Sequence, residues 1–124
     1  MIKTILAIGI GGAAGSLLRY FISVITARPS TSFPVSTFII NIAGCFLVGL
    51  FYAMSLKYSW LHTEWRLFLM TGFCGGFTTF SAFALENIKL LQNGEISTFL
   101  LYTFLSIAVG LIAVLGGINL LKLF

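Results

Sequence analysis

The sequence has few charged residues and no aspartate. Charged side chains make up 8% of its 124 residues, and its only acids are Glu64, Glu86 and Glu95. Soluble domains average about 25% charged residues, so this composition excludes an ordinary soluble globular protein. The sequence also has no paired-carboxylate site, no Ser/His/Asp set and no phosphate-binding loop. These absences argue against an enzyme.

Metal-ligating side chains are equally scarce. Cys45 and Cys74 lie within apolar runs, where a free cysteine behaves as a small hydrophobic residue. The single histidine, His62, lies in a polar connection between two such runs. We therefore expect neither a disulfide nor a metal site built from cysteine and histidine.

Long apolar runs account for most of the chain. Hydrophobic residues make up 59% of it and the mean hydropathy is +1.08. A helix needs about 20 apolar residues to cross a bilayer, and four runs reach that length, at residues 5–25, 35–56, 65–91 and 96–121. The connections are short, so the sequence predicts a single all-α membrane domain over residues 1–124. The first run is too long for the apolar part of a cleaved secretory signal.

Positive charge is divided almost evenly between the two ends of the predicted helices. With four spans, one side of the membrane receives Lys3, Lys57, Arg66 and Lys122. The other side receives Arg28 and Lys89, and Arg19 lies inside the first span towards that side. Lysine and arginine normally concentrate on the cytoplasmic side. The near balance leaves two interpretations open: a weak preference for cytoplasmic termini, or dual topology with antiparallel pairing of two copies.

The third run has an unusual centre, GFCGGFTTFSAF at residues 72–83. Glycine weakens a helix interior by roughly 0.5–1 kcal/mol relative to alanine. Gly72, Gly75 and Gly76, followed by Thr78 and Thr79, therefore predict a break or an unwound turn in mid-span. Irregular backbone at membrane depth must be buried in protein or line a cavity, and carbonyls freed at a break can coordinate a cation such as Na⁺. The alternative is an intact helix with a glycine-rich packing face.

Glycines four residues apart favour close helix packing. Gly11 and Gly15 form one such pair, and Gly72 and Gly76 form another. Small residues at this spacing let helix backbones approach closely in lipid. We therefore expect the first and third runs to use these residues in helix contacts.

Polar and aromatic residues form repeating patterns in the last three runs. Side chains four apart share a helix face, which groups Thr37, Asn41, Cys45 and Gly49 on the second run, and Thr98, Tyr102, Ser106 and Gly110 on the fourth. Intramembrane polar residues are costly, so these stripes predict either interhelical hydrogen bonds or a polar pathway. The positive edges of the Phe80 and Phe83 rings could help to solvate a dehydrated anion, as could the Ser81 hydroxyl.

Three stretches of the chain stand out together: GGAAGSLLRY at 11–20, STFIINIAGCFLVG at 36–49 and GFCGGFTTFSAF at 72–83. They resemble the signature sequences of the bacterial fluoride channels, the Fluc or CrcB family. The third is highly specific, the second moderately so, and the first is weaker alone. The length and the four spans match as well, so the resemblance covers essentially the whole chain.

The resemblance implies an antiparallel, dual-topology homodimer in the bacterial inner membrane, with two pores. Its function would be passive export of F⁻, which enters acidified cells as HF and is trapped when it ionises. A structural Na⁺ at the dimer centre would be held by backbone carbonyls of Gly75 and Thr78 from both subunits. The residues that map onto the ion pathway are Asn41, Phe80, Ser81, Ala82, Phe83, Glu86, Tyr102 and Ser106.

Ala82 is a departure from the family pattern. The family usually reads TTFSTF, whereas this chain reads TTFSAF and so lacks a threonine hydroxyl of the implied polar track. We expect folding and Na⁺ binding to survive this change, and fluoride occupancy or conduction to be lower than with threonine.

Two other classes of function share some of these features with the channel. A small four-helix multidrug or cation exchanger could share the dual topology, but it usually needs a carboxylate midway along the first helix, where this chain has Arg19 and no acid. A non-transporting assembly subunit would give no reason for the glycine-rich centre or the polar stripes. The expected partners are fluoride, a second copy and lipid, with no nucleic acid.

Overall fold

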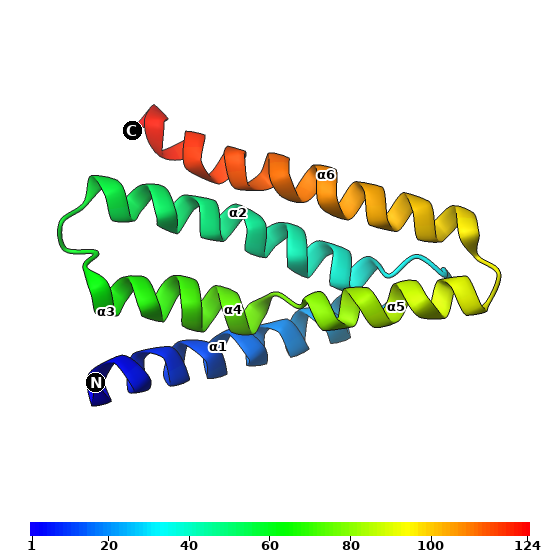
Figure 1. Cartoon of the computed structure of the whole chain (residues 1–124), viewed down its shortest axis with the longest axis horizontal. Helices are drawn as coiled ribbons and strands as arrows, with labels where there is room; N and C mark the ends of the chain where they lie inside the picture. Colours follow the sequence, from blue (N-terminus) through cyan, green and yellow to red (C-terminus); the bar gives the residue numbers. More distant parts are fainter.

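The computed structural model describes residues 1–124 and contains helices and connections but no strands. The helices are α1 (Ile2–Thr26), α2 (Val35–Lys57), α3 (Thr63–Arg66), η1 (Leu67–Cys74), α4 (Gly75–Phe77), α5 (Phe80–Gln92), α6 (Ile96–Leu120) and η2 (Leu121–Leu123). Elements α3, η1, α4 and α5 follow one another along one line beside α2 (Figure 1). Together they form the segment Thr63–Gln92, which we call the third rod.

Four helical segments are long and apolar enough to cross a membrane. They are Ile2–Thr26, Val35–Lys57, Thr63–Gln92 and Ile96–Leu123. These segments coincide with the four predicted runs to within a few residues, so the all-helical, four-span prediction is confirmed. The protein is a multi-pass membrane protein.

The helix ends follow local chemistry. Proline restricts the residue before it to extended conformations, and α1 ends just before Arg28 and Pro29. Between α5 and α6, Gly94 has the only positive φ in the chain, +74°. The N–H of Glu95 donates to the Leu90 carbonyl at 2.8 Å and that of Gly94 to Leu91 at 3.1 Å. This pair of bonds is a Schellman motif, which reverses the chain within a few residues.

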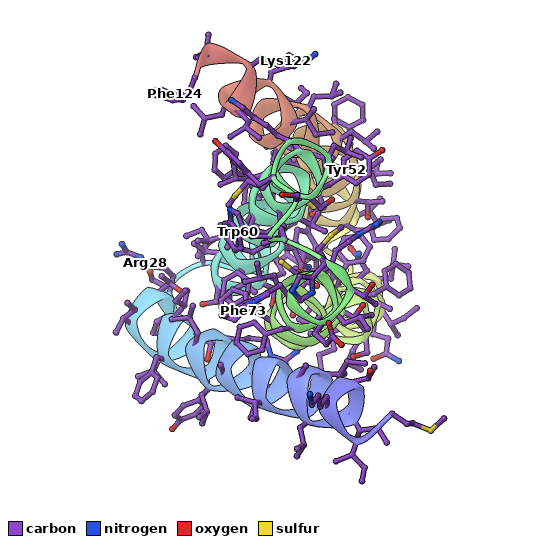
Figure 2. The ribbon with its side chains drawn as sticks, turned by 90° about the vertical axis from the view of Figure 1, so that its left-hand side faces the viewer. Arg28, Tyr52, Trp60, Phe73, Lys122 and Phe124 are labelled. Atoms are coloured by element: carbon purple, nitrogen blue, oxygen red, sulfur yellow. The ribbon has the colours of Figure 1, made fainter.

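Glycines set the spacing between α1 and the third rod. A Cβ at Gly11 or Gly15 would collide with backbone atoms of residues 68–77, and one at Gly76 would collide with the backbone of Gly12. The predicted packing role of both glycine pairs is therefore confirmed. Viewed from its end, the bundle has α1 along the edge opposite α6 (Figure 2).

A second glycine contact joins α2 to α6. A Cβ at Gly49 would collide with the Val114 carbonyl, and one at Gly117 would collide with the Phe46 carbonyl. Only six apolar side chains are buried: Ile40, Leu61, Cys74, Phe77, Leu90 and Tyr102. Most large apolar side chains instead face outward, as lipid-facing residues of a membrane bundle do.

The glycines of the third rod do not have the helix-breaking role that the sequence predicted for them. Gly75 has ordinary helical angles, φ −64° and ψ −38°. The two extended residues are instead Thr78, with φ −81° and ψ 160°, and Thr79, with φ −150° and ψ 111°. The glycines therefore do not unwind the chain here; those facing α1 serve close packing. The segment η1, which ends just before Gly75, is π-helical, and no pattern in the sequence predicted this.

Candidate functional site

The extended residues Thr78 and Thr79 are held by side chains from other helices. On α2, the Asn41 Nδ2 donates to the Thr79 carbonyl at 3.1 Å, and the Thr79 N–H donates to the Asn41 Oδ1 at 2.8 Å. The Thr79 Oγ1 accepts a hydrogen bond from the Ala82 N–H at 3.2 Å. Thr79 is therefore the N-cap of α5, a position that threonine favours because its hydroxyl satisfies a free helix N–H.

Helix α1 also reaches this interruption. Arg19 Nη1 lies 3.4 Å from the Thr78 carbonyl oxygen, and the Ser16 Oγ lies 3.4 Å from that of Gly76. Residues three apart share a face of a helix, so both donors point to the third rod. The sequence identified Arg19 as a cation within the first span. In the structure its guanidinium lies against the extended segment at Thr78.

The interruption frees the two carbonyls that the resemblance implied as cation ligands, those of Gly75 and Thr78. In a continuous helix the Gly75 carbonyl would accept from the Thr79 N–H, and the Thr78 carbonyl from the Ala82 N–H. Both N–H groups donate to side-chain oxygens instead. Carbonyl oxygens at a break suit a cation such as Na⁺, although the Thr78 oxygen already receives the Arg19 guanidinium. These two oxygens alone do not complete the shell of a cation, which requires further ligands.

Six of the predicted site residues border one cavity of about 430 Å³. They are Asn41, Gly75, Thr78, Phe80, Phe83 and Ser106. The Phe80 and Phe83 rings lie with centroids 5.8 Å apart. The Ser106 Oγ is buried and has no hydrogen-bond partner. The cavity therefore combines aromatic rings with one amide and one free hydroxyl, in an otherwise mainly apolar wall.

Glu86 and Tyr102 belong to a neighbouring polar cluster. The Thr37 Oγ1 donates to the Glu86 Oε1 at 2.5 Å, and the Tyr102 hydroxyl donates to Oε2 at 3.4 Å. This arrangement joins α2, α5 and α6 at a single carboxylate. Glu86 also borders a second cavity of about 420 Å³, together with Arg28 and Lys89. The Tyr102 ring contacts Phe83 at a centroid distance of 5.1 Å, so the two regions adjoin.

The remaining predicted residues lie outside the first cavity. Ser81 is exposed, and its Oγ is 3.3 Å from the Thr79 Oγ1. Ala82 is half-buried and contributes its backbone N–H to the cap of α5. Thr79 and Thr37 were not among the predicted pathway or cation-binding residues. Thr37 could have been included, because it belongs to the polar stripe that contains Asn41.

The sequence also matches known proteins over nearly its full length. Residues 6–118 match the model of the family described as "CrcB-like protein, Camphor Resistance (CrcB)". The chain is 47% identical, over the whole of both sequences, to a protein of Azobacteroides pseudotrichonymphae named "Fluoride-specific ion channel FluC". Proteins of the same name from Flavobacterium psychrophilum and Prosthecochloris aestuarii are 47% and 42% identical, over 97% of this chain in each case.

The family match and the full-length relatives agree with the three stretches that carried the resemblance in the sequence. The exchanger and assembly-subunit interpretations gain no support from any of them. This chain belongs to the CrcB-like family.

Proposed function

We propose that this protein is a fluoride-selective channel through which F⁻ leaves the cell passively. The relatives that match 97% or more of this chain are named as fluoride-specific ion channels, and a channel is not an enzyme. The structural observation that supports the proposal most directly is the cavity in which Phe80, Phe83 and the unpartnered Ser106 hydroxyl meet.

These groups suit a small, strongly hydrated anion. An ion that gives up its water needs replacement donors, and several weak sites let it leave again. The Ser106 hydroxyl can donate a hydrogen bond, and ring edges present positive potential. The residues proposed for the pathway are Asn41, Phe80, Ser81, Ala82, Phe83, Glu86, Tyr102 and Ser106.

The channel is proposed to be an antiparallel, dual-topology homodimer with two pores, in the inner membrane of a bacterium. The nearly even distribution of Lys and Arg supports insertion in both directions. Phe80, at 79% exposed, leaves an aromatic surface beside the cavity for a second copy. The third helix would then be broken in mid-membrane, at Thr78 and Thr79.

A structural Na⁺ is proposed at the dimer centre, held by the freed carbonyls of Gly75 and Thr78 from both subunits. Its role would be to bridge the two interrupted helices. Replacing Na⁺ by N-methylglucamine is therefore expected to lower the thermal unfolding temperature of the purified dimer, measured by the fluorescence of Trp60 and Trp65. If the unfolding temperature stays the same as Na⁺ is raised from zero to a 100-fold excess over the protein, such a site is excluded.

Ion flux from liposomes tests the proposed function. Vesicles that contain the protein are expected to release F⁻ down its gradient, measured with a fluoride electrode, without an imposed proton gradient. Chloride-loaded vesicles serve as the selectivity control, and protein-free vesicles measure leakage of HF. Equal release of chloride, or release that requires a proton gradient, would contradict a fluoride-selective channel and favour an exchanger.

Restoring a hydroxyl at position 82 is expected to increase fluoride flux. A hydrogen bond contributes about 1 kcal/mol, so Ala82→Thr should raise the flux by about fivefold. Ala82→Val, which has a similar volume and no hydroxyl, is the matched control. If the threonine and valine variants conduct alike, position 82 does not contribute a donor to the path.

A further inference from the structure

The side-chain amide of Asn41 pairs with the backbone of a single residue. Its Oδ1 accepts from the Thr79 N–H at 2.8 Å, and its Nδ2 donates to the Thr79 carbonyl at 3.1 Å. Together these bonds use an acceptor and a donor of the carboxamide on one backbone residue. Both distances lie within the usual range for N–H···O bonds.

One of the bonded backbone groups, the Thr79 N–H, has no partner within a helix. Thr79 is extended and is the N-cap of α5, so its carbonyl occupies the position that accepts the first hydrogen bond of that helix, whereas its N–H precedes the helix. Buried backbone polar groups almost always find a partner, and lipid offers none. Asn41 therefore supplies the acceptor that the Thr79 N–H would have had in a continuous helix, and its Nδ2 gives the Thr79 carbonyl an additional donor.

We propose that Asn41 is a positioning residue that holds the Thr79 backbone and thereby fixes where α5 begins. Thr79 caps α5 through its Oγ1, and Phe80 is the first residue of that helix. Holding Thr79 thus sets the place of Phe80 and, one turn on, of Phe83. The Asn41 Oδ1 is engaged with backbone and not with an ion, so only the second Nδ2 hydrogen could face the cavity.

This assignment narrows the role that the resemblance implies and the proposed pathway includes, in which Asn41 faces the pore as an ion-pathway residue. Its consequence for conduction rests on the proposed channel function, whereas its consequence for the Thr79 hydrogen bonds does not. The amide is also specific, because a neutral carboxamide offers both a donor and an acceptor. Leucine or alanine offers neither, and aspartate always keeps an acceptor oxygen.

Hydrogen exchange at the Thr79 amide tests the proposal. The full-length protein would be studied by NMR in lipid nanodiscs, with exchange rates compared for wild type, Asn41→Leu, Asn41→Ala and Asn41→Asp. We expect Thr79 to exchange at least tenfold faster in the leucine and alanine variants. Aspartate should keep it protected, since an acceptor oxygen remains in either charge state. Alanine provides the comparison if leucine prevents folding.

A second amide in the bundle supplies the matched control. Asn87 is buried at 6% exposure, and its Oδ1 accepts from the Thr103 hydroxyl at 3.2 Å, a side chain and not the backbone. Asn87→Leu should therefore leave exchange at Thr79 unchanged, and amides of α6 report whether each variant is folded. Unchanged Thr79 exchange in folded Asn41→Ala would overturn the proposal.

Fluoride flux measured on the same variants separates the two roles of Asn41. If Asn41 acts only by facing the ion, fluoride flux would fall in Asn41→Ala while hydrogen exchange at the Thr79 amide stayed slow. That result would overturn the positioning role. If no variant, wild type included, releases fluoride, the channel function fails while the exchange result still decides the role of Asn41.

Discussion

Gly15→Leu is expected to prevent α1 from packing against the third rod. Even a Cβ at Gly15 would collide with the Phe73 carbonyl oxygen and lie 2.8 Å from the Phe77 nitrogen. These are backbone atoms of a neighbouring helix, so no rotamer change relieves the collision. Overpacking typically costs about 1–3 kcal/mol and occasionally more, and a rigid backbone on both sides places this change at or above the upper value. The measurement is thermal unfolding in detergent, followed by tryptophan fluorescence.

The matched control for this experiment lies on the same helix. Gly9 has nothing within 4 Å of the position that a Cβ would occupy. Gly9→Ala should leave stability unchanged or raise it by about 0.5–1 kcal/mol, because alanine favours the helix. If Gly15→Leu unfolds at the wild-type temperature, α1 does not depend on the close contact that the structure places there.

Tyr102→Ala is expected to destabilise the protein by about 2–3 kcal/mol. Tyr102 is 0% exposed, and its ring contacts those of Phe33 and Phe83, with centroids 5.3 and 5.1 Å away. Removing an aromatic ring from a soluble core costs about 3–5 kcal/mol. The loss of stability is smaller here because lipid is as apolar as the protein interior. Burying the ring therefore gains little from leaving water, and the cost of its removal is mainly the lost packing contacts. A lower midpoint of thermal unfolding in detergent would measure it.

Tyr102→Phe separates this packing role from the proposed role in the ion pathway. The variant keeps the ring contacts and removes only the hydroxyl that donates to Glu86. We expect a small loss of stability, about 1 kcal/mol, together with a clear loss of fluoride flux. A phenylalanine variant that conducts like wild type would remove the Tyr102 hydroxyl from the pathway and leave it as a packing residue.

The four helices could be predicted because lipid imposes a simple requirement. A span must be long, apolar and internally hydrogen-bonded, and those properties are readable in any window of about 20 residues. The glycine pairs were predictable for a related reason, since Gly11 and Gly15 mark one face of a helix at a spacing of four. Both predictions concern properties of a single helix, and both agree with the structure.

The interruption was harder to predict in detail because it depends on contacts between helices. Glycine propensity drew attention to Gly75 and Gly76, yet the extended residues are Thr78 and Thr79. Their backbone groups are satisfied by Asn41 from α2 and by Arg19 from α1. No local pattern around residues 72–83 indicates which distant side chains will supply those bonds.

The buried glycines have a consequence for how this protein tolerates substitution. In a soluble domain the largest apolar residues occupy the centre and vary least, whereas here the contacts between helices are made by Gly15, Gly49, Gly76 and Gly117. Large side chains such as Leu111 and Phe104 lie outside, at 65% and 69% exposed. In a library that places every amino acid at every position, these contact glycines should therefore accept almost no substitution, whereas the large exposed side chains should exchange freely for one another.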